Sequence, residues 1–111
     1  MKNKKKIAED RKKYNQTSHA RYYDYRYSAK ARGFAFDLSE AEFISIISSL
    51  CHYCGSNQYI GVDRKENNIG YSKENCVPCC FPCNRMKFTM SYVDFIEKCA
   101  IIAKNTRGGE A

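Results

Sequence analysis

The sequence predicts a small α+β domain in which helices stand on both sides of a short β segment braced by cysteines. Three observations lead to this fold class. The chain has 111 residues, which is enough for one domain but too little for a large two-domain enzyme. Helix patterns occur in the first half and near the end, and two Cys-x-x-Cys pairs frame two short β-like runs. No apolar run is long enough to cross a membrane, so a membrane protein is not expected.

The first predicted helix runs from about residue 16 to residue 32 and carries both basic and aromatic side chains. This segment contains neither Pro nor Gly, and Tyr22, Tyr25 and Ala29 recur near helical spacing. Gly33 follows at a position where a left-handed residue commonly ends a helix. The basic side chains of this helix are Arg21, Arg26, Lys30 and Arg32.

A second helix is predicted over residues 40–49, and its start is marked by a capping box. Ser39 and Glu42 stand three residues apart, as the reciprocal pair of hydrogen bonds in a capping box requires. Apolar residues then follow at the i, i+3, i+4, i+7 positions of an amphipathic helix. They are Phe43, Ile46, Ile47 and Leu50.

Two short strands and two further helices complete the predicted order. The β-like runs cover residues 59–64 and 76–79, with a polar loop between them. Pro82 is placed to open a third helix, because proline is favoured in a first helical turn. Ser91 caps a last helix that reaches about Lys104. The apolar stripe of that helix consists of Val93, Ile96, Cys99, Ala100 and Ala103.

The seven cysteines indicate a metal site rather than disulfides. Their number is odd and the N-terminus lacks the apolar region of a signal peptide, which argues against a secreted disulfide scaffold. Two Cys-x-x-Cys knuckles can close a tetrahedral thiolate cage around a structural zinc ion, whose binding contributes on the order of 10 kcal/mol to folding. Cys76 and Cys79 form an alternative second pair. The preferred ligands are Cys51, Cys54, Cys80 and Cys83.

The charge balance indicates a polyanionic partner. Nineteen Lys or Arg against 12 Asp or Glu give a net charge of +7. Residues 1–32 hold 11 Lys or Arg and 3 Asp or Glu, whereas the other 79 residues hold 8 and 9. This concentration of positive charge predicts nucleic acid as the partner, with Lys and Arg contacting phosphates. The expected contacts are Lys12, Lys13, Arg21, Arg26, Lys30, Arg32, Arg85 and Lys87.

Polar residues between and just after the cysteine pairs resemble the pattern of the His-Asn-His (HNH) endonucleases. The resemblance covers about residues 51–87. It is carried by Gly-Val-Asp-Arg ending at Arg64, by Gly-Tyr-Ser around Tyr71, and by Cys-Phe-Pro-Cys-Asn-Arg-Met-Lys from Cys80. The sequence is similar to a restriction-enzyme variant of the family that has Asp-Arg, Tyr and Asn in these places. The resemblance implies a ββα-metal (His-Me finger) fold and endonuclease activity. The active-site positions that it implies are Asp63, Arg64, Tyr71 and Asn84.

These residue types suit hydrolysis of a phosphodiester bond. Asp63 and Asn84 offer hard oxygen ligands for one Mg²⁺ or Mn²⁺ ion. Arg64 stands where the family pattern has its histidine base, and a guanidinium keeps its proton, so Arg64 is assigned to the scissile phosphate. Tyr71 is then the preferred proton acceptor, provided that a nearby cation stabilises its phenolate. His19 and water activated directly by the metal are the alternatives.

Structural alternatives accompany three of these candidates. Asn75 is counted in the candidate catalytic set, but an asparagine also bonds local backbone readily and would then hold the loop. Asp63 has a turn cap or an ion pair as its alternative role. Tyr71 has simple packing of the loop as its alternative role.

The sequence divides into a basic arm (1–15), a helical DNA-holding segment (16–50), an HNH-type zinc-bound module (51–105) and a tail (106–111). It predicts an intracellular, metal-dependent endonuclease that hydrolyses double-stranded DNA, of homing, phage or restriction type. The alternative is a zinc-containing nucleic-acid-binding module without catalysis, which the replacement of histidine by Arg64 favours. A basic ribosome-associated zinc-ribbon protein is a third interpretation. Homodimer formation is left open, and a phage or virus origin is what the family suggests.

Overall fold

The computed structural model describes residues 17–108, which form four helices and a two-stranded antiparallel sheet. The predicted α+β class and order of elements agree with it. Lys12 and Lys13, with the rest of the predicted arm, lie outside the described residues, as do the last three residues of the predicted tail. The elements are α2 (Ser18–Ala31), α3 (Glu40–Ile47), β1 (Ile60–Arg64), β2 (Cys76–Cys80), α4 (Phe81–Lys87) and α5 (Tyr92–Thr106).

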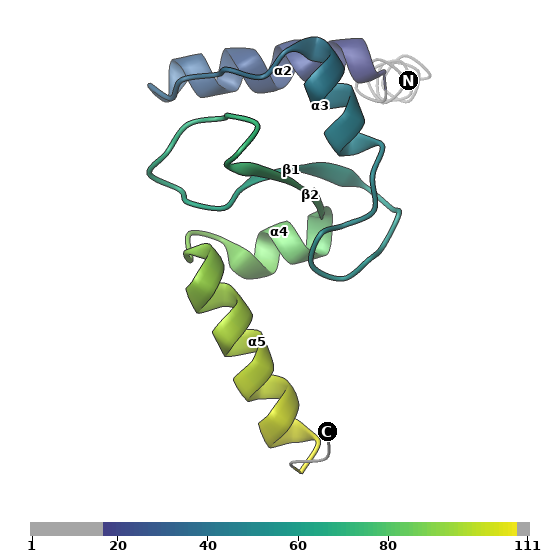
Figure 1. Ribbon diagram of the computed structural model, residues 1–111, viewed down its shortest axis with the longest axis vertical. Coiled ribbons are helices and arrows are strands. Elements are labelled where there is room, and N and C mark those ends of the chain that lie inside the picture. The colour runs from purple at the N-terminus through teal and green to yellow at the C-terminus, as the bar shows by residue number, and fades with distance from the viewer. Residues whose placement is uncertain (1–16, 109–111) are drawn as a thin grey trace, which may run out of the picture.

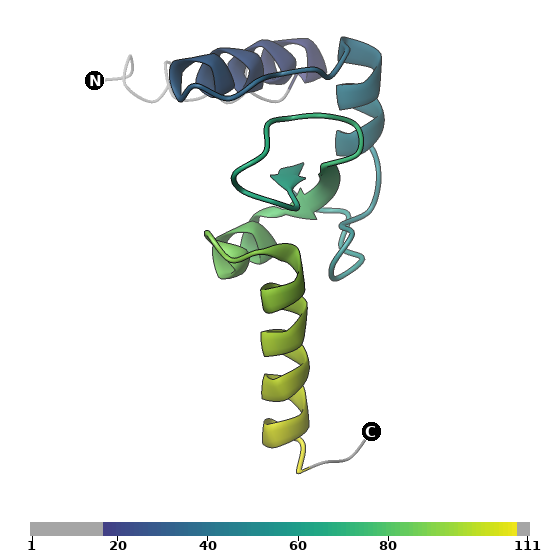
Figure 2. The same cartoon turned by 60° about the vertical axis from the view of Figure 1, so that its left-hand side comes forward.

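The sheet lies between two layers of helix (Figure 1). Helices α2 and α3 cover one side of β1 and β2, and α4 lies on the other side. Helix α5 leads away from the other elements in both views (Figures 1 and 2). The centre of the molecule is therefore the hairpin of β1 and β2 together with α4, the ββα arrangement that the resemblance implies.

The helix ends follow the local sequence signals. Thr17 caps α2 by accepting a hydrogen bond from the backbone N–H of Ala20, and Gly33 follows the helix at a φ of 80°. Helix α3 has the complete capping box, because the Ser39 hydroxyl accepts from the Glu42 N–H at 3.1 Å and the Glu42 carboxylate accepts from the Ser39 N–H at 2.9 Å. The prediction of this capping box is confirmed.

The tyrosines of α2 divide between the core and the surface. Tyr22 is buried, donates to the carbonyl of Leu38 at 3.0 Å, and packs edge-on against Phe43. Phe43 and Val62 belong to the same buried cluster. Tyr27, in contrast, is 77% exposed. Burial of the Tyr22 and Phe43 rings contributes the hydrophobic free energy that holds α2 and α3 on the sheet.

Side chains of α2 also cap the outer edge of β1. Arg21 donates to the carbonyl oxygen of Ile60, and the Tyr25 hydroxyl accepts from the N–H of Val62 at 3.1 Å. Gly61 stands between these groups, and a Cβ there would lie only 2.5 Å from the Tyr25 hydroxyl. Arg21 was expected to contact DNA, but in this structure its guanidinium ties α2 to the strand.

A long loop joins the strands and is fixed to the rest of the molecule at Tyr71. The Tyr71 N–H donates to Ala35 and its carbonyl accepts from Asp37, which makes a short parallel bridge to the segment before α3. Gly70 permits this approach, because a Cβ at that position would lie 2.6 Å from the Ala35 oxygen. The loop therefore presents Tyr71 in one defined place.

The apolar stripe of α5 remains mostly uncovered. Phe95 is the buried residue of this helix, packed on Tyr53 with ring centroids 5.1 Å apart. Val93 and Ile96 are 59% and 42% exposed. The helix was predicted correctly, but most of its stripe does not contribute to the core. In the described part of the chain, every helix is too short or too polar to cross a membrane.

Candidate active site

Four cysteine sulfurs gather at one end of the sheet. The sulfur atoms of the cluster all lie within 4.8 Å of one another. Cys54 and Cys80 are 3.6 Å apart at their sulfurs, and tetrahedral zinc with bonds of about 2.3 Å requires about 3.8 Å between sulfurs. The donor type and spacing therefore fit a metal ion such as zinc. The four cysteines are Cys51, Cys54, Cys80 and Cys83, which are the predicted ligands.

The backbone shapes both knuckles. Gly55 has a φ of 78° and its N–H donates to the carbonyl of Cys51, which closes the first turn. Cys80 ends β2 and stands at the N-cap of α4, so Cys83 falls in the first turn of the helix. Burial opposes ionisation of Cys51, but hydrogen bonds from the backbone, the strongest from Cys80, lower the pKa of this thiol to about 6.

The alternative cysteine pair is not formed as a knuckle. Residues three apart on a strand point to opposite faces, and Cys76 and Cys79 are three apart on β2. Cys76 lies in the core beside Val62, where burial raises the pKa of its thiol to about 11. Both side chains behave as buried apolar groups.

A second site, which we call the Asp63 cleft, opens at the other end of the hairpin. It has a volume of about 540 Å³. Four of the five predicted catalytic residues line it, although they come from β1, the loop and α4. They are Asp63, Arg64, Tyr71 and Asn84. The walls also include Arg32, Phe34 and Phe88.

Asp63 has partners at both carboxylate oxygens. Its Oδ1 lies 3.4 Å from Nζ of Lys87, and its Oδ2 accepts a hydrogen bond of 2.7 Å from Tyr53. Burial, followed by the hydrogen bond to Asp63, raises the pKa of Tyr53, so this phenol stays protonated and keeps donating. The carboxylate is thereby held in one orientation at the wall of the cleft.

Lys87 corrects one expectation from the sequence. It was expected to contact phosphate from the helix surface, but its side chain is fully buried. The ammonium group also donates to the carbonyl oxygen of Arg64 at 3.0 Å. A lysine enters a protein interior when such partners compensate the loss of hydration, and here they join α4 to the end of β1.

The Arg64 side chain bonds the loop between β1 and β2 through one of its guanidinium nitrogens. Its Nη1 donates to the carbonyl oxygens of Asn67 and Ile69, the second at 3.1 Å. The guanidinium also lies 3.9 Å from the ring centroid of Phe34, in cation–π geometry. The positive charge is therefore fixed at the rim of the Asp63 cleft before any ligand binds.

Tyr71 receives a cationic hydrogen bond that the sequence did not indicate. Nη2 of Arg32 donates to its hydroxyl oxygen at 3.0 Å. Since a guanidinium only donates, the phenolic oxygen must accept in this pair. Arg32 was expected to contact DNA, and the structure adds a direct contact with the candidate proton acceptor.

The remaining candidates occupy different positions. Asn75 donates to the carbonyls of Glu66, Ile69 and Gly70 and accepts from the N–H of Glu66, so its side chain holds the loop together. It does not line the Asp63 cleft. His19 pairs with Glu40 at the start of α2, at 3.1 Å, and it too does not line this cleft.

Exposed basic residues remain available for a polyanion. Lys30 and Arg32 stand on or just after the last turn of α2. Arg85 projects from α4 with its guanidinium 5.5 Å from the ring centroid of Phe81. The predicted contacts that are exposed in the structure are Arg26, Lys30, Arg32 and Arg85.

Comparisons with known proteins bear on the fold of this chain. The structure of the rare-cutting HNH restriction endonuclease PacI matches 83% of this chain and 82% of that chain, with a TM-score of 0.62 and 25% sequence identity. The chain has an HNH-like fold. It is also 39% identical over 94 residues to Uncharacterized protein R423 of Acanthamoeba polyphaga mimivirus, and this match covers 82% of the chain but 18% of the viral protein. The chain thus spans less than a fifth of that relative's length. No protein-family model matches the chain.

Proposed function

We propose that this chain is a metal-dependent DNA endonuclease of the HNH type, with the Asp-Arg, Tyr and Asn residues of the PacI-like variant. The observation that carries the proposal is the convergence of Asp63, Arg64, Tyr71 and Asn84 on one cleft within an HNH-like fold. In this proposal the cysteine cluster holds structural zinc. Double-stranded DNA is the substrate, because the neighbour with this fold is a restriction endonuclease and the exposed Arg32 lines the cleft beside Arg64.

Asp63 and Asn84 are the residues that would hold a catalytic Mg²⁺ or Mn²⁺. When bound, such an ion stabilises the charge that develops on the phosphate and on the departing 3′ oxygen. Tyr53 and Lys87 keep the Asp63 carboxylate oriented, so little reorganisation is needed when a ligand arrives. The Asp63 side chain approaches the site from β1 and the Asn84 side chain approaches it from α4.

The reaction is an in-line displacement at phosphorus. A bond forms between the water oxygen and phosphorus, and the bond from phosphorus to the 3′ oxygen breaks. Tyr71, whose hydroxyl oxygen accepts a hydrogen bond from Arg32, takes the proton from the attacking water, and solvent returns a proton to the departing 3′ oxygen. Arg64 stabilises the phosphate through N–H groups other than Nη1, because Nη1 is bonded to the loop.

A second candidate function is a nucleic-acid-binding module without catalysis. The specific observation in its favour is that Lys87 and Tyr53 already satisfy both oxygens of Asp63. In this candidate, Asp63 serves only to join β1 to α4 through its ion pair with Lys87, and no metal binds in the cleft. This candidate predicts DNA binding that is indifferent to Mg²⁺.

The deciding experiment is cleavage of supercoiled plasmid by folded, zinc-loaded protein. We expect nicking that requires Mg²⁺ or Mn²⁺ and falls at least about a hundredfold in Asn84→Ala, because one oxygen ligand is lost. Asn105→Ala, on the exposed end of α5, is the matched control and should cut normally. Absence of cutting by the wild type over a range of salt and metal concentrations would favour the binding module.

A further inference from the structure

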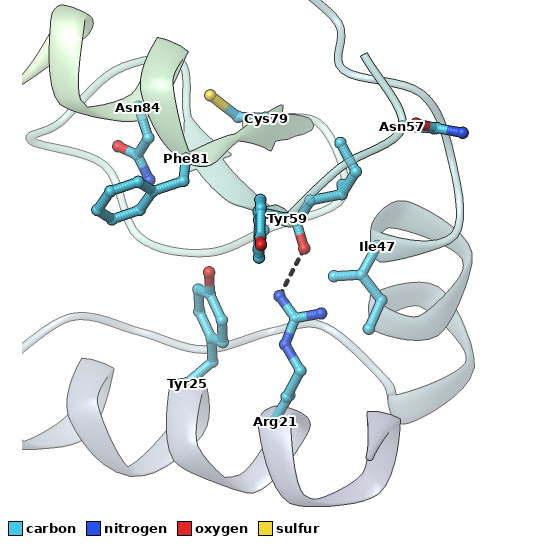
Figure 3. A pocket seen from close by; sticks show the side chains of 10 residues that line it. Arg21, Tyr25, Ile47, Asn57, Tyr59, Cys79, Phe81 and Asn84 are labelled. Carbon is cyan, nitrogen blue, oxygen red and sulfur yellow. Dashed lines mark hydrogen bonds between the residues drawn. The ribbon is translucent and has the colours of Figure 1, made fainter. Parts of the chain in front are cut away.

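A second cleft lies beside the Asp63 cleft, and Asn84 lines both. It has a volume of about 510 Å³ and is formed by α2, the start of β1 and the start of α4. We call it the aromatic cleft. Figure 3 shows Tyr25 rising from α2 and Phe81 and Asn84 extending from α4 toward the same space, with the Tyr59 ring between them.

Backbone strain marks the rims of both clefts. In the part of the chain that the structure describes, the two non-glycine residues with positive φ are both exposed aromatics. Tyr59, with a φ of 55°, is 81% exposed and lines the aromatic cleft. Phe88, with a φ of 50°, is 77% exposed and lines the Asp63 cleft. This conformation is unfavourable for a bulky side chain, and rings so exposed gain little from burial, so the strain suggests that a ligand uses them.

The floor of the aromatic cleft is rigid, whereas its rim is open. Hydrogen bonds to β1 hold Arg21 and Tyr25 in place, and Gly61 leaves room for the Tyr25 hydroxyl. At the rim, Phe81 is 58% exposed, and Arg85 lies over its ring. A flat ligand can therefore enter between exposed rings and meet a preformed polar floor, next to a positive charge.

We propose that the aromatic cleft binds an unpaired nucleobase of the DNA strand whose phosphate occupies the Asp63 cleft. This inference rests on the proposed function, which places that phosphate. The rings of Tyr59 and Phe81 provide stacking faces, and the amide NH₂ group of Asn84 provides hydrogen-bond donors at the wall between the clefts, while its oxygen is left for the metal of the proposed function. Arg85 supplies positive charge to the adjacent backbone.

The test compares two single strands of equal length, an oligothymidylate and an abasic strand with the same phosphates but no bases. Fluorescence anisotropy gives the affinity of the zinc-loaded full chain for each, without Mg²⁺, so cutting is not needed. We expect the wild type to prefer the strand with bases by about tenfold, the effect of one stacked base. Tyr59→Ala and Phe81→Ala should bring this ratio close to one.

Two controls keep the result specific to the cleft. Tyr59→Phe retains a ring and should keep the preference. Tyr27→Ala removes a ring on α2 that is exposed to a similar extent as Tyr59 but does not line the cleft, and it should keep the preference as well. Equal affinity of the wild type for both strands, or an equal loss in Tyr27→Ala, would overturn the proposal.

The outcome can be separated from that of the proposed function. Plasmid cleavage together with equal affinity for the two strands would overturn the nucleobase site alone. A cleft-dependent preference for bases without any plasmid cleavage would support the nucleobase site and contradict the nuclease.

Discussion

The two sites of this molecule use the same β-hairpin and α4 in opposite ways. The cysteine cluster brings four identical donors within 4.8 Å of one another and leaves no place for a substrate. The Asp63 cleft brings two different oxygen donors to an open space of about 540 Å³, together with cationic and phenolic side chains. A complete ligand set is typical of a structural metal, whereas an incomplete set beside open space is typical of a catalytic one. In the proposed function, the first site provides stability and the second provides the chemistry.

The largest expected effect tests the structural half of this contrast. Cys83→Ser should abolish the cooperative thermal transition, because zinc binding contributes on the order of 10 kcal/mol to folding. Circular dichroism with a zinc assay measures both quantities. Cys99→Ser, outside the cluster, is the control and should melt normally. A cooperative transition that survives in Cys83→Ser would show that the cluster does not hold the fold together.

The next largest effect tests whether the ion pair at the Asp63 cleft also stabilises the fold. Lys87→Met should lower the free energy of unfolding by about 3–5 kcal/mol, because Asp63 would remain buried without its cation. Urea unfolding measures this change. Arg85→Met, on the exposed side of α4, should leave stability nearly unchanged. Comparable stability of the two variants would contradict the role given to Lys87.

Tyr71→Phe tests the chemical half of the contrast. The change removes the oxygen that accepts from Arg32, so we expect the cleavage rate to fall by about 10²–10⁴-fold with DNA affinity unchanged. Single-turnover cleavage and filter binding measure the two quantities. Tyr27→Phe is the matched control. A rate near that of the wild type would transfer the role of base to water activated by the metal.

Tyr53→Phe should have the smallest effect of the four. It removes the hydrogen bond that orients Asp63 but leaves the carboxylate and its ion pair in place. We expect cleavage to slow by about 10- to 100-fold and to need more Mg²⁺, because a charge-assisted hydrogen bond is worth about 1.5–3 kcal/mol. A Mg²⁺ titration of the cleavage rate separates this from general destabilisation. Tyr23→Phe, which changes an exposed ring, should behave like the wild type.

Features set by neighbouring residues could be predicted from the sequence. The capping box of Ser39 and Glu42, the helix end before Gly33 and the helix start at Pro82 depend on local chemistry alone. The choice of cysteine pairs followed from spacing, and the alternation of side chains along β2 explains it. Four candidates of the Asp63 cleft were found because the resemblance supplied their positions.

Features set by tertiary packing could not be predicted. Lys87 and Asp63 are 24 positions apart, and the packing of α4 on β1 alone decides that they meet. The contact of Arg32 with Tyr71 and that of Tyr53 with Asp63 depend in the same way on how the loop and the knuckle fold back. A clue existed for Tyr53, because it lies inside the first knuckle close to the strand, but nothing in the sequence gives its partner.

Selective removal of each metal from the same protein sample is the most direct test of the contrast between the two sites. Plasmid cleavage and the thermal melt are recorded after removal of Mg²⁺ and, separately, after removal of zinc. We expect Mg²⁺ removal to stop cleavage and leave the melt unchanged, whereas zinc removal should abolish both until zinc is returned. Cleavage that persists without Mg²⁺, or a melt that is unchanged without zinc, would contradict this expectation.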